Sequence, residues 1–197
     1  MKAMVITALG GPEVLQAKDM PKPTPGEYDL LIEPHVAGLN PVDIKIRKHG
    51  LRGDRSFPFI PGYDVSGTVV GMGAKVTRFK EGDDVYASPS LARHGAHAEL
   101  VCVDARTAAY KPTTLTHEQA AALPLVTITA WESLHDRARL HPRETVLIHA
   151  GAGGVEEALR VRPEVRAEGI DAEVGERGGA AGGGDAADLQ RGRIEVE

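Results

Sequence analysis

The sequence has few of the residues that would mark it for secretion, for membranes or for nucleic acid. Among 197 residues there is one cysteine, Cys102, which excludes an internal disulfide and any zinc site built from several cysteines, and which fits a reducing compartment. The net charge is −5 with no basic cluster, so nucleic acid is not expected as a partner. The longest apolar run, 120–131, contains Pro124 and two threonines and is too short to cross a bilayer. The N-terminus also has no apolar stretch long enough for a signal peptide. We therefore expect a cytoplasmic protein without a membrane partner.

Residues 1 to about 110 have the pattern of a β-rich region. Short apolar segments are separated by Gly and Pro, and many short strands at close spacing are typical of a partly open barrel. The pattern predicts strands at 2–9, 30–36, 62–70, 85–87 and 96–103. It also predicts one helix over 42–48, with Asn40 as its N-cap and Pro41 at its first position.

Near residue 115 the periodicity changes from strand-like to helical. Thr116 and Gln119 have the spacing of a capping box, which predicts a helix start. Apolar residues then recur at spacings of three and four and predict one buried helix face, formed by Leu125, Ile128, Trp131, Leu134 and Ala138. Pro142 is expected to end this helix.

A glycine-rich turn follows the next predicted strand, in the stretch TVLIHAGAGGV from Thr145 to Val155. A strand that runs into such a turn begins a nucleotide-binding βαβ unit, because the glycines let the backbone approach a pyrophosphate at the next helix N-terminus. Gly151 and Gly153 occupy the first and third positions of the fingerprint, but Glu156 occupies the sixth, where glycine is expected. An ordinary strand ending in a Gly-rich loop is the alternative interpretation.

The composition changes after Val155. Residues 156–197 contain no aromatic residue, Lys, Ser, Thr, Asn, His or Cys, and the apolar residues are too few to bury a face. We expect this tail to be disordered, and three explanations remain open: a linker, a natural low-complexity tail, or GC-rich DNA translated in a shifted frame. Translating the other two frames of the locus tests the last of these, which predicts that one frame continues the nucleotide-binding unit.

Five motifs in chain order together resemble the medium-chain dehydrogenase/reductase family. They are AGLNPVDIK (37–45), FPFIPGYDVSGTVV (57–70), GDDVY (82–86), AAALP (120–124) and AGAGGV (150–155). The resemblance is greatest to the branch of zinc-free quinone oxidoreductases and alkenal or enone reductases. It implies a mixed β and α/β fold: a GroES-like catalytic domain over 1–115, the start of a Rossmann-type NAD(P)-binding domain over 116–155, and the anomalous tail over 156–197.

The resemblance also implies that zinc is absent. Zinc-dependent relatives carry a cysteine and a His-Glu pair at the positions that Asn40, Tyr63 and Asp64 occupy here. A catalytic zinc needs about three protein ligands, and at most one oxygen donor remains. His94 and His97 are the other candidate pair, and we expect them to be solvated loop residues.

Without zinc, the resemblance implies hydride transfer from NADPH to a quinone or an α,β-unsaturated carbonyl, with NADH left open. It places Asn40, Lys45 and Tyr63 near the nicotinamide or the substrate. The alternatives are that Asn40 only caps a helix, that Lys45 is solvated and that Tyr63 packs in the core. Cys102 is expected to be a small buried hydrophobe.

The cofactor contacts implied by the resemblance come from the second domain: Thr129, Gly151, Ala152, Gly153, Gly154 and Val155. Thr129 has the alternative of a helix residue that hydrogen-bonds a backbone carbonyl. The resemblance further implies a homodimer for the intact family. The competing hypothesis is a truncated, inactive family fragment whose GroES-like domain folds alone or acts as an interaction module.

Overall fold

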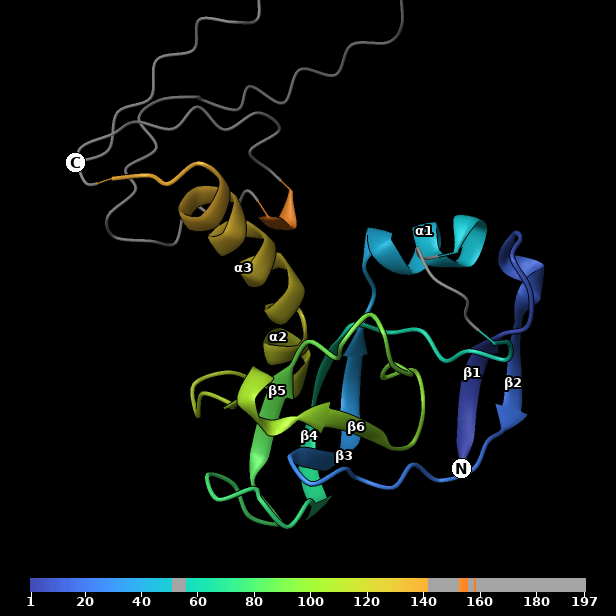
Figure 1. Ribbon diagram of the computed structural model, residues 1–197, viewed down its shortest axis with the longest axis horizontal. Helices are drawn as coiled ribbons and strands as arrows, with labels where there is room; N and C mark the ends of the chain where they lie inside the picture. Colours follow the sequence, from blue (N-terminus) through green and yellow to red (C-terminus); the bar gives the residue numbers. More distant parts are fainter. Residues whose placement is uncertain (51–55, 142–152, 156–157, 159–197) are drawn as a thin grey trace, which may run out of the picture. The chain divides into compact units, whose positions relative to one another are not determined.

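The computed structural model describes residues 1–50, 56–141, 153–155 and 158 (Figure 1). The chain divides into two compact units, Met1–Leu125 and Val126–Glu197, and each is considered by itself. The predicted strand and glycine turn at 145–152, and the tail from 159 onward, lie outside the described residues.

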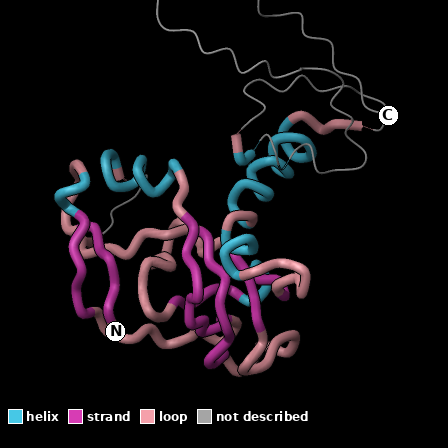
Figure 2. The backbone as a smooth tube through the Cα atoms, turned by 180° about the vertical axis from the view of Figure 1, so that it is seen from behind, coloured by secondary structure: helices cyan, strands magenta, loops and turns pink. Residues whose placement is uncertain are grey.

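The first unit begins with a two-stranded antiparallel hairpin. Strand β1 (Lys2–Ile6) pairs with β2 (Leu15–Asp19), and a 3₁₀ turn, η1 (Pro12–Val14), lies between them. Single bridges, Ala3 to Ala98 and Ile6 to Phe59, connect β1 to later segments. Figure 2 shows the hairpin as a separate ribbon beside the larger sheet.

The second sheet of this unit has five antiparallel strands in the order β6-β3-β4-β5-β7. Their bounds are β3 (Asp29–Gly38), β4 (Asp64–Met72), β5 (Asp84–Ala87), β6 (Val101–Asp104) and β7 (Ala108–Tyr110), with a 3₁₀ turn, η2 (Ala105–Thr107), before β7. The register between β3 and β4 shifts at Leu31/Ile32 and again at Pro34/Val36. Such bulges bend a strand and increase its twist, which lets this sheet curl around its own core.

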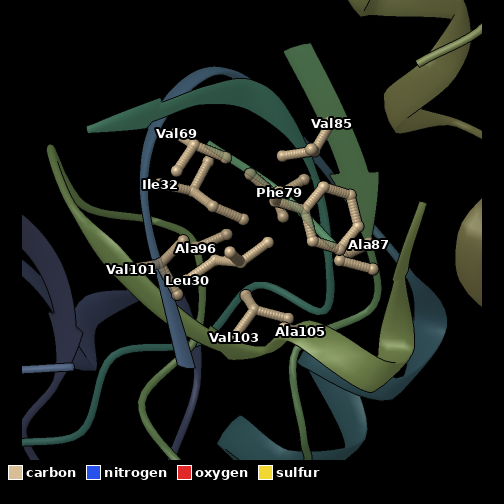
Figure 3. Close-up of a cluster of buried hydrophobic side chains, with 12 residues drawn as sticks. Leu30, Ile32, Val69, Phe79, Val85, Ala87, Ala96, Val101, Val103 and Ala105 are labelled. Atoms are coloured by element: carbon tan, nitrogen blue, oxygen red, sulfur yellow. The ribbon is translucent and has the colours of Figure 1, made fainter. Parts of the chain in front are cut away.

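The main core lies inside the curl of this sheet. Figure 3 shows its side chains pointing toward one another around Phe79. They come from alternate positions of several strands, as the two-residue period of a strand requires. Leu30 and Ile32 of β3 and Val85 of β5 have no exposed surface.

Two helices of the first unit begin at the caps that the sequence predicts. Helix α1 (Pro41–His49) follows Asn40 and ends at Gly50, whose φ of 74° is in the left-handed region that favours glycine. Helix α2 (His117–Ala121) follows Thr116, whose hydroxyl accepts a hydrogen bond from the Gln119 N–H. In return, the Gln119 side chain accepts from the Thr116 N–H at 3.0 Å, so the predicted capping box is confirmed.

The predicted strands and the long helix need several corrections. Strands β2 and β7 were not predicted, and the strand expected over 96–103 begins only at Val101, where β6 starts. The reason is that Ala96 and His97 donate their N–H groups to the carbonyls of Gly62 and Pro61, outside the sheet ladder. The helix expected after Thr116 is interrupted at Pro124, where α3 (Pro124–Trp131) begins.

The described residues of the second unit form a small helical cluster. Helix α3 continues into a π-helical turn, η3 (Glu132–Arg137). Ala130 and Leu134 are buried here and pack with Leu140, Val155 and Ala158. The predicted apolar face is therefore only partly correct, because Ile128 is 42% and Trp131 48% exposed. Among the described helices, none combines the length and the apolar character needed to cross a membrane.

Candidate functional site

A buried polar cluster lies where α1 and β4 begin. Asp64, the first residue of β4, is 1% exposed, and its carboxylate receives two hydrogen bonds. The Asn40 amide donates from Nδ2 to Oδ2 at 2.7 Å, and the Leu125 backbone N–H donates to Oδ1, also at 2.7 Å. One carboxylate thus connects the start of α1 with the residue that follows Pro124.

A second carboxylate, that of Asp43, holds the same region from the other side. Its Oδ2 accepts from the Asn40 backbone N–H at 2.8 Å, which is the return bond of a helix-capping arrangement. Its Oδ1 accepts from the Gly62 N–H at 2.9 Å. Asn40 is consequently fixed through both its backbone and its side chain, and only 8% of it is exposed.

The electrostatics of this cluster make Asp64 an unusual carboxyl group. Burial raises the pKa of Asp64 to about 6, and the nearby negative charge of Asp43 adds to the rise. The hydrogen bonds from Asn40 and from Leu125 act in the opposite direction, because they stabilise the carboxylate. Asp64 can therefore hold or release a proton near neutral pH.

The bond to Asp64 also orients the Asn40 amide. A primary amide has two N–H donors and one acceptor oxygen. One donor is used by Asp64, and the oxygen faces the Asp43 backbone N–H in the capping box. The other donor forms no hydrogen bond with any residue that the structure describes. Asn40 is thus both a helix cap and a preorganised polar group, so the two roles expected for it are compatible.

Tyr63 and Lys45 are not brought together with Asn40 in this way. Tyr63 is fully buried and packs with Ile6, Ile46 and Phe59, and its carbonyl accepts from the Ser88 hydroxyl at 2.6 Å. This is the core-packing arrangement given as its alternative. Lys45 is exposed on α1. Their contact with a substrate or nicotinamide stays a prediction.

Sequence reasoning missed Asp43, and it considered Asp64 only as a replaced zinc position. The signal for Asp43 was present, since it stands three residues after Asn40, at the spacing of a capping box.

Among the described residues, no group of three or more His, Cys, Asp and Glu side chains is arranged to hold a metal ion.

The residues predicted to contact the cofactor lie in the second unit and are only partly described. Thr129 is exposed on α3, and its carbonyl accepts from the Ser133 hydroxyl at 2.7 Å. Gly151 and Ala152 are outside the described residues. Gly153 lies in a bend, and Gly154 and Val155 are helical. A Cβ on Gly154 would approach Val126 Cγ1 to 3.3 Å, so glycine allows a close approach of this turn to α3.

A second polar cluster connects α2 to the sheet. His117 Nδ1 lies 2.8 Å from the Ser66 hydroxyl, and its Nε2 lies 3.6 Å from Asp84 Oδ2. Its ring stacks on that of His35 at 4.2 Å between centroids. Burial and the neighbouring His35 lower the pKa of His117, although Asp84 acts against this.

The structure also places the other residues that the sequence singled out, His94, His97 and Cys102. His94 Nδ1 accepts from the Ile60 N–H at 3.2 Å, and its ring stacks against Phe59. His94 is exposed and His97 half-buried, in the loop where they were expected. Cys102 is buried in β6, as expected, and burial raises the pKa of its thiol to about 11.

Comparisons with known proteins agree with this architecture. Residues 26–115 match the alcohol dehydrogenase GroES-like domain. The chain is 36% identical over 156 residues to mouse quinone oxidoreductase, covering 79% of this chain and 46% of that protein. It is 39% identical over 163 residues to the chloroplastic NADPH-dependent alkenal/one oxidoreductase of Arabidopsis thaliana, covering 79% of this chain and 42% of that protein.

A solved structure shows the same likeness. A mycobacterial protein complexed with NADPH superimposes with a TM-score of 0.71 at 37% identity, over 81% of this chain and 48% of that one. The chain spans about half the length of the relatives it matches. The curled antiparallel sheet confirms the predicted GroES-like, partly open barrel. The chain belongs to the medium-chain dehydrogenase/reductase family, and two of the relatives that it matches are themselves named quinone oxidoreductase and alkenal/one oxidoreductase.

Proposed function

We propose that this chain contributes the substrate-side unit of a zinc-independent oxidoreductase that transfers a hydride from NADPH to a quinone or an α,β-unsaturated carbonyl. The support comes from relatives named quinone oxidoreductase and NADPH-dependent alkenal/one oxidoreductase. The observation that carries the proposal is the Asn40 amide, which Asp64 and Asp43 hold in one orientation.

The described residues fit a nicotinamide dinucleotide in one respect. The chain passes from a bend at Gly153 into helical residues Gly154 and Val155, and the lack of a side chain at Gly154 keeps this turn close to α3. This is the kind of glycine-to-helix transition that receives a pyrophosphate. Thr129, Gly151 and Ala152 would complete the contacts. The bound cofactor would supply the hydride.

The role of Asn40 in this proposal is to orient the acceptor. Its second amide N–H would donate to the carbonyl or quinone oxygen, where negative charge develops as the acceptor is reduced. A donor that is already oriented stabilises such charge without reorganising during the reaction. Because the other N–H is bonded to Asp64 at 2.7 Å, the amide cannot rotate without losing that bond.

Asp64 would act through Asn40 and through its own proton. With a pKa of about 6, it is partly protonated near neutral pH. The carboxylate form holds the Asn40 amide, and the acid form is a reserve of one proton close to it. Lys45 is proposed to line the same region as a cation near the reduced acceptor. Tyr63, which is fully buried, would support that region from the core behind it.

The absence of zinc is part of the proposal. Zinc-dependent relatives carry zinc ligands at three positions. Two of these positions are occupied here by Asn40 and Asp64, whose side chains are hydrogen-bonded to each other. The third, Tyr63, lies in the core with no exposed surface. A metal would have to displace the amide from the carboxylate and would still lack nitrogen or sulfur ligands.

Titration with NADPH tests the proposal, followed through Trp131, the single tryptophan, which lies two residues from Thr129. Saturable quenching together with NADPH oxidation on adding a quinone supports it. No saturable change at millimolar NADPH would refute the cofactor function for this chain. Lys45→Ala and Lys48→Ala form a matched pair, since both residues are exposed on α1. Only Lys45→Ala is expected to reduce turnover.

A second function is favoured by one observation. The unit Met1–Leu125 contains two sheets and its own core, so it has what it needs to fold without a nucleotide domain. The alternative is a GroES-like interaction module without catalysis, which includes self-association as a homodimer. Suppose that the chain is folded, does not bind NADPH and elutes from a size-exclusion column as a stable homodimer or as a stable complex with a partner. This result would establish the interaction module.

A further inference from the structure

The first unit contains a cavity that the proposed function does not use. Its volume is about 550 Å³, within the range of about 300–1,000 Å³ that is typical of small-molecule sites. It is lined by segment 20–24, by loop 92–95 and by residues 100–102 at the start of β6. Neither Asn40 nor Asp64 lines it.

The wall of this cavity combines apolar side chains with a pair of stacked aromatic rings. The apolar part includes Met1, Met20 and Leu100. The rings are those of Phe59 and His94, whose centroids are 5.3 Å apart; Phe59 is buried, so His94 presents the exposed ring of the pair. Flexible methionine side chains adapt to planar ligands and make favourable sulfur–aromatic contacts. The wall therefore suits a flat aromatic body.

The charges on the cavity wall all have one sign. Its residues include Lys22 and Arg93 but no aspartate or glutamate. This differs from the chain as a whole, which has a net charge of −5. A concave surface with charges of one sign concentrates its field and selects ligands of the opposite sign. The cavity therefore favours an anion.

The two cations differ in how firmly they are held. Arg93 forms a bidentate pair with Asp29, with NH1 to Oδ1 at 2.8 Å and NH2 to Oδ2 at 2.6 Å. Lys22 has no ion pair with any residue that the structure describes, so its ammonium group is available to a ligand. Cys102 also lines the cavity, and its thiol is neutral at pH 7 because burial raises its pKa to about 11.

We propose that this cavity binds a small aromatic carboxylate, with the ring packed among Met1, Met20 and the exposed His94 side chain and the carboxylate on Lys22. The ring is desolvated by the apolar wall, and the ammonium of Lys22 provides the charge partner at the rim. The charge of Arg93 is already neutralised by Asp29, so Arg93 helps to shape the cavity wall and adds little to the affinity for the carboxylate.

The test uses 2-naphthoate as the probe and 2-naphthalenemethanol as its uncharged counterpart, each titrated into the full chain by calorimetry. We expect saturable binding of naphthoate that weakens with added salt, and binding of the alcohol that is at least about threefold weaker, as for a partly exposed charge pair. Lys22→Gln should weaken naphthoate by about threefold or more and leave the alcohol unchanged. The matched control is Lys18→Gln, an exposed lysine of β2 outside the cavity wall, which should change neither.

The position of the ligand can be read without any variant. The chain has four methionines, of which Met1 and Met20 line the cavity and Met4 and Met72 do not. In a sample with ¹³C-labelled methionine methyl groups, naphthoate should shift the Met1 and Met20 signals only. Equal binding of acid and alcohol, equal effects at Lys22 and Lys18, or shifts at Met4 and Met72 instead would each overturn the proposal. So would the lack of saturable binding at millimolar naphthoate.

Discussion

Two glycines of β4 should respond in opposite directions to the same substitution. Gly67 pairs with Pro34 where the β3–β4 register shifts. A Cβ at Gly67 would collide with the carbonyl oxygen of Glu33 and would come within 2.9 Å of both the Glu33 carbonyl carbon and Pro34 Cα. These are backbone atoms of the neighbouring strand, so no side-chain rotation can relieve the overlap. Gly67→Ala therefore requires β3 and β4 to separate locally.

The control lies four residues further along the same strand. A Cβ at Gly71 would lie 3.6 Å from the Leu31 side chain, which is ordinary van der Waals contact. Gly71→Ala should therefore be neutral or should stabilise by up to about 1 kcal/mol, because alanine has less freedom to lose on folding. Overpacking against fixed atoms costs about 3 kcal/mol, at the upper end of measured values. We expect the two variants to differ by about 3–4 kcal/mol, or roughly 150- to 1,000-fold in the folded-to-unfolded ratio.

Urea denaturation followed by tyrosine fluorescence or far-UV circular dichroism measures this difference. All four tyrosines lie in Met1–Leu125, whereas Trp131 does not, so tryptophan fluorescence would report on the wrong unit. The midpoint should fall for Gly67→Ala and should stay or rise for Gly71→Ala, with similar slopes. Equal midpoints for the two variants would show that the β3–β4 contact is looser than the structure indicates.

Three further predictions concern charged groups of the first unit. The folded-state pKa of Asp64 is raised from 3.8 to about 6, so the folded protein binds this proton more tightly than the unfolded chain. Lowering the pH from about 7 to about 4 should therefore stabilise the protein relative to Asp64→Asn by about 1–3 kcal/mol. If the urea midpoints of the two proteins differ by the same amount at every pH in that range, the raised pKa is contradicted. The pKa of His117 is lowered, so the protein should lose stability relative to His117→Gln as the pH falls below about 6.5, and parallel melting temperatures would exclude this. Arg93→Met leaves the carboxylate of Asp29 without its bidentate partner and should cost about 1–3 kcal/mol in urea midpoint measurements, whereas no loss would mean that solvent replaces the guanidinium.

Local sequence signals predicted the caps and strands that depend on neighbouring residues. Asn40, Pro41 and Thr116 predicted the starts of α1 and α2 because capping is decided within four residues. Strand β2 was missed because LQAKD has no β-branched residue and only a partly buried Leu15, so it does not have the alternation of a half-buried strand. Strand β7 is three residues long, too short for any periodicity.

Contacts between distant residues could not be predicted in the same way. Asp64 is 24 residues from Asn40 and 61 from Leu125, and no local pattern indicates that one carboxylate will accept from both. The family resemblance placed Tyr63 near the substrate, with core packing as its alternative, and the sequence could not decide between them. Successive residues of an extended chain point to opposite sides. In the structure the Tyr63 ring packs into the core while the Asp64 carboxylate meets the polar cluster.

The alkylation rate of the single cysteine reports how often β6 detaches from β3. Cys102 lies in β6, pairs with Leu31 and is 8% exposed. With a thiol pKa of about 11, about one molecule in ten thousand carries the thiolate at pH 7, and the thiolate is the form that reacts with alkylating reagents. Alkylation of the native protein must therefore await either a rare ionisation or the detachment of β6 from β3. The two routes differ in their response to urea, because only the detachment of β6 becomes more frequent as urea weakens the fold. The part of the labelling rate that rises with urea therefore measures the fluctuation that detaches β6, with no competing cysteine in the chain.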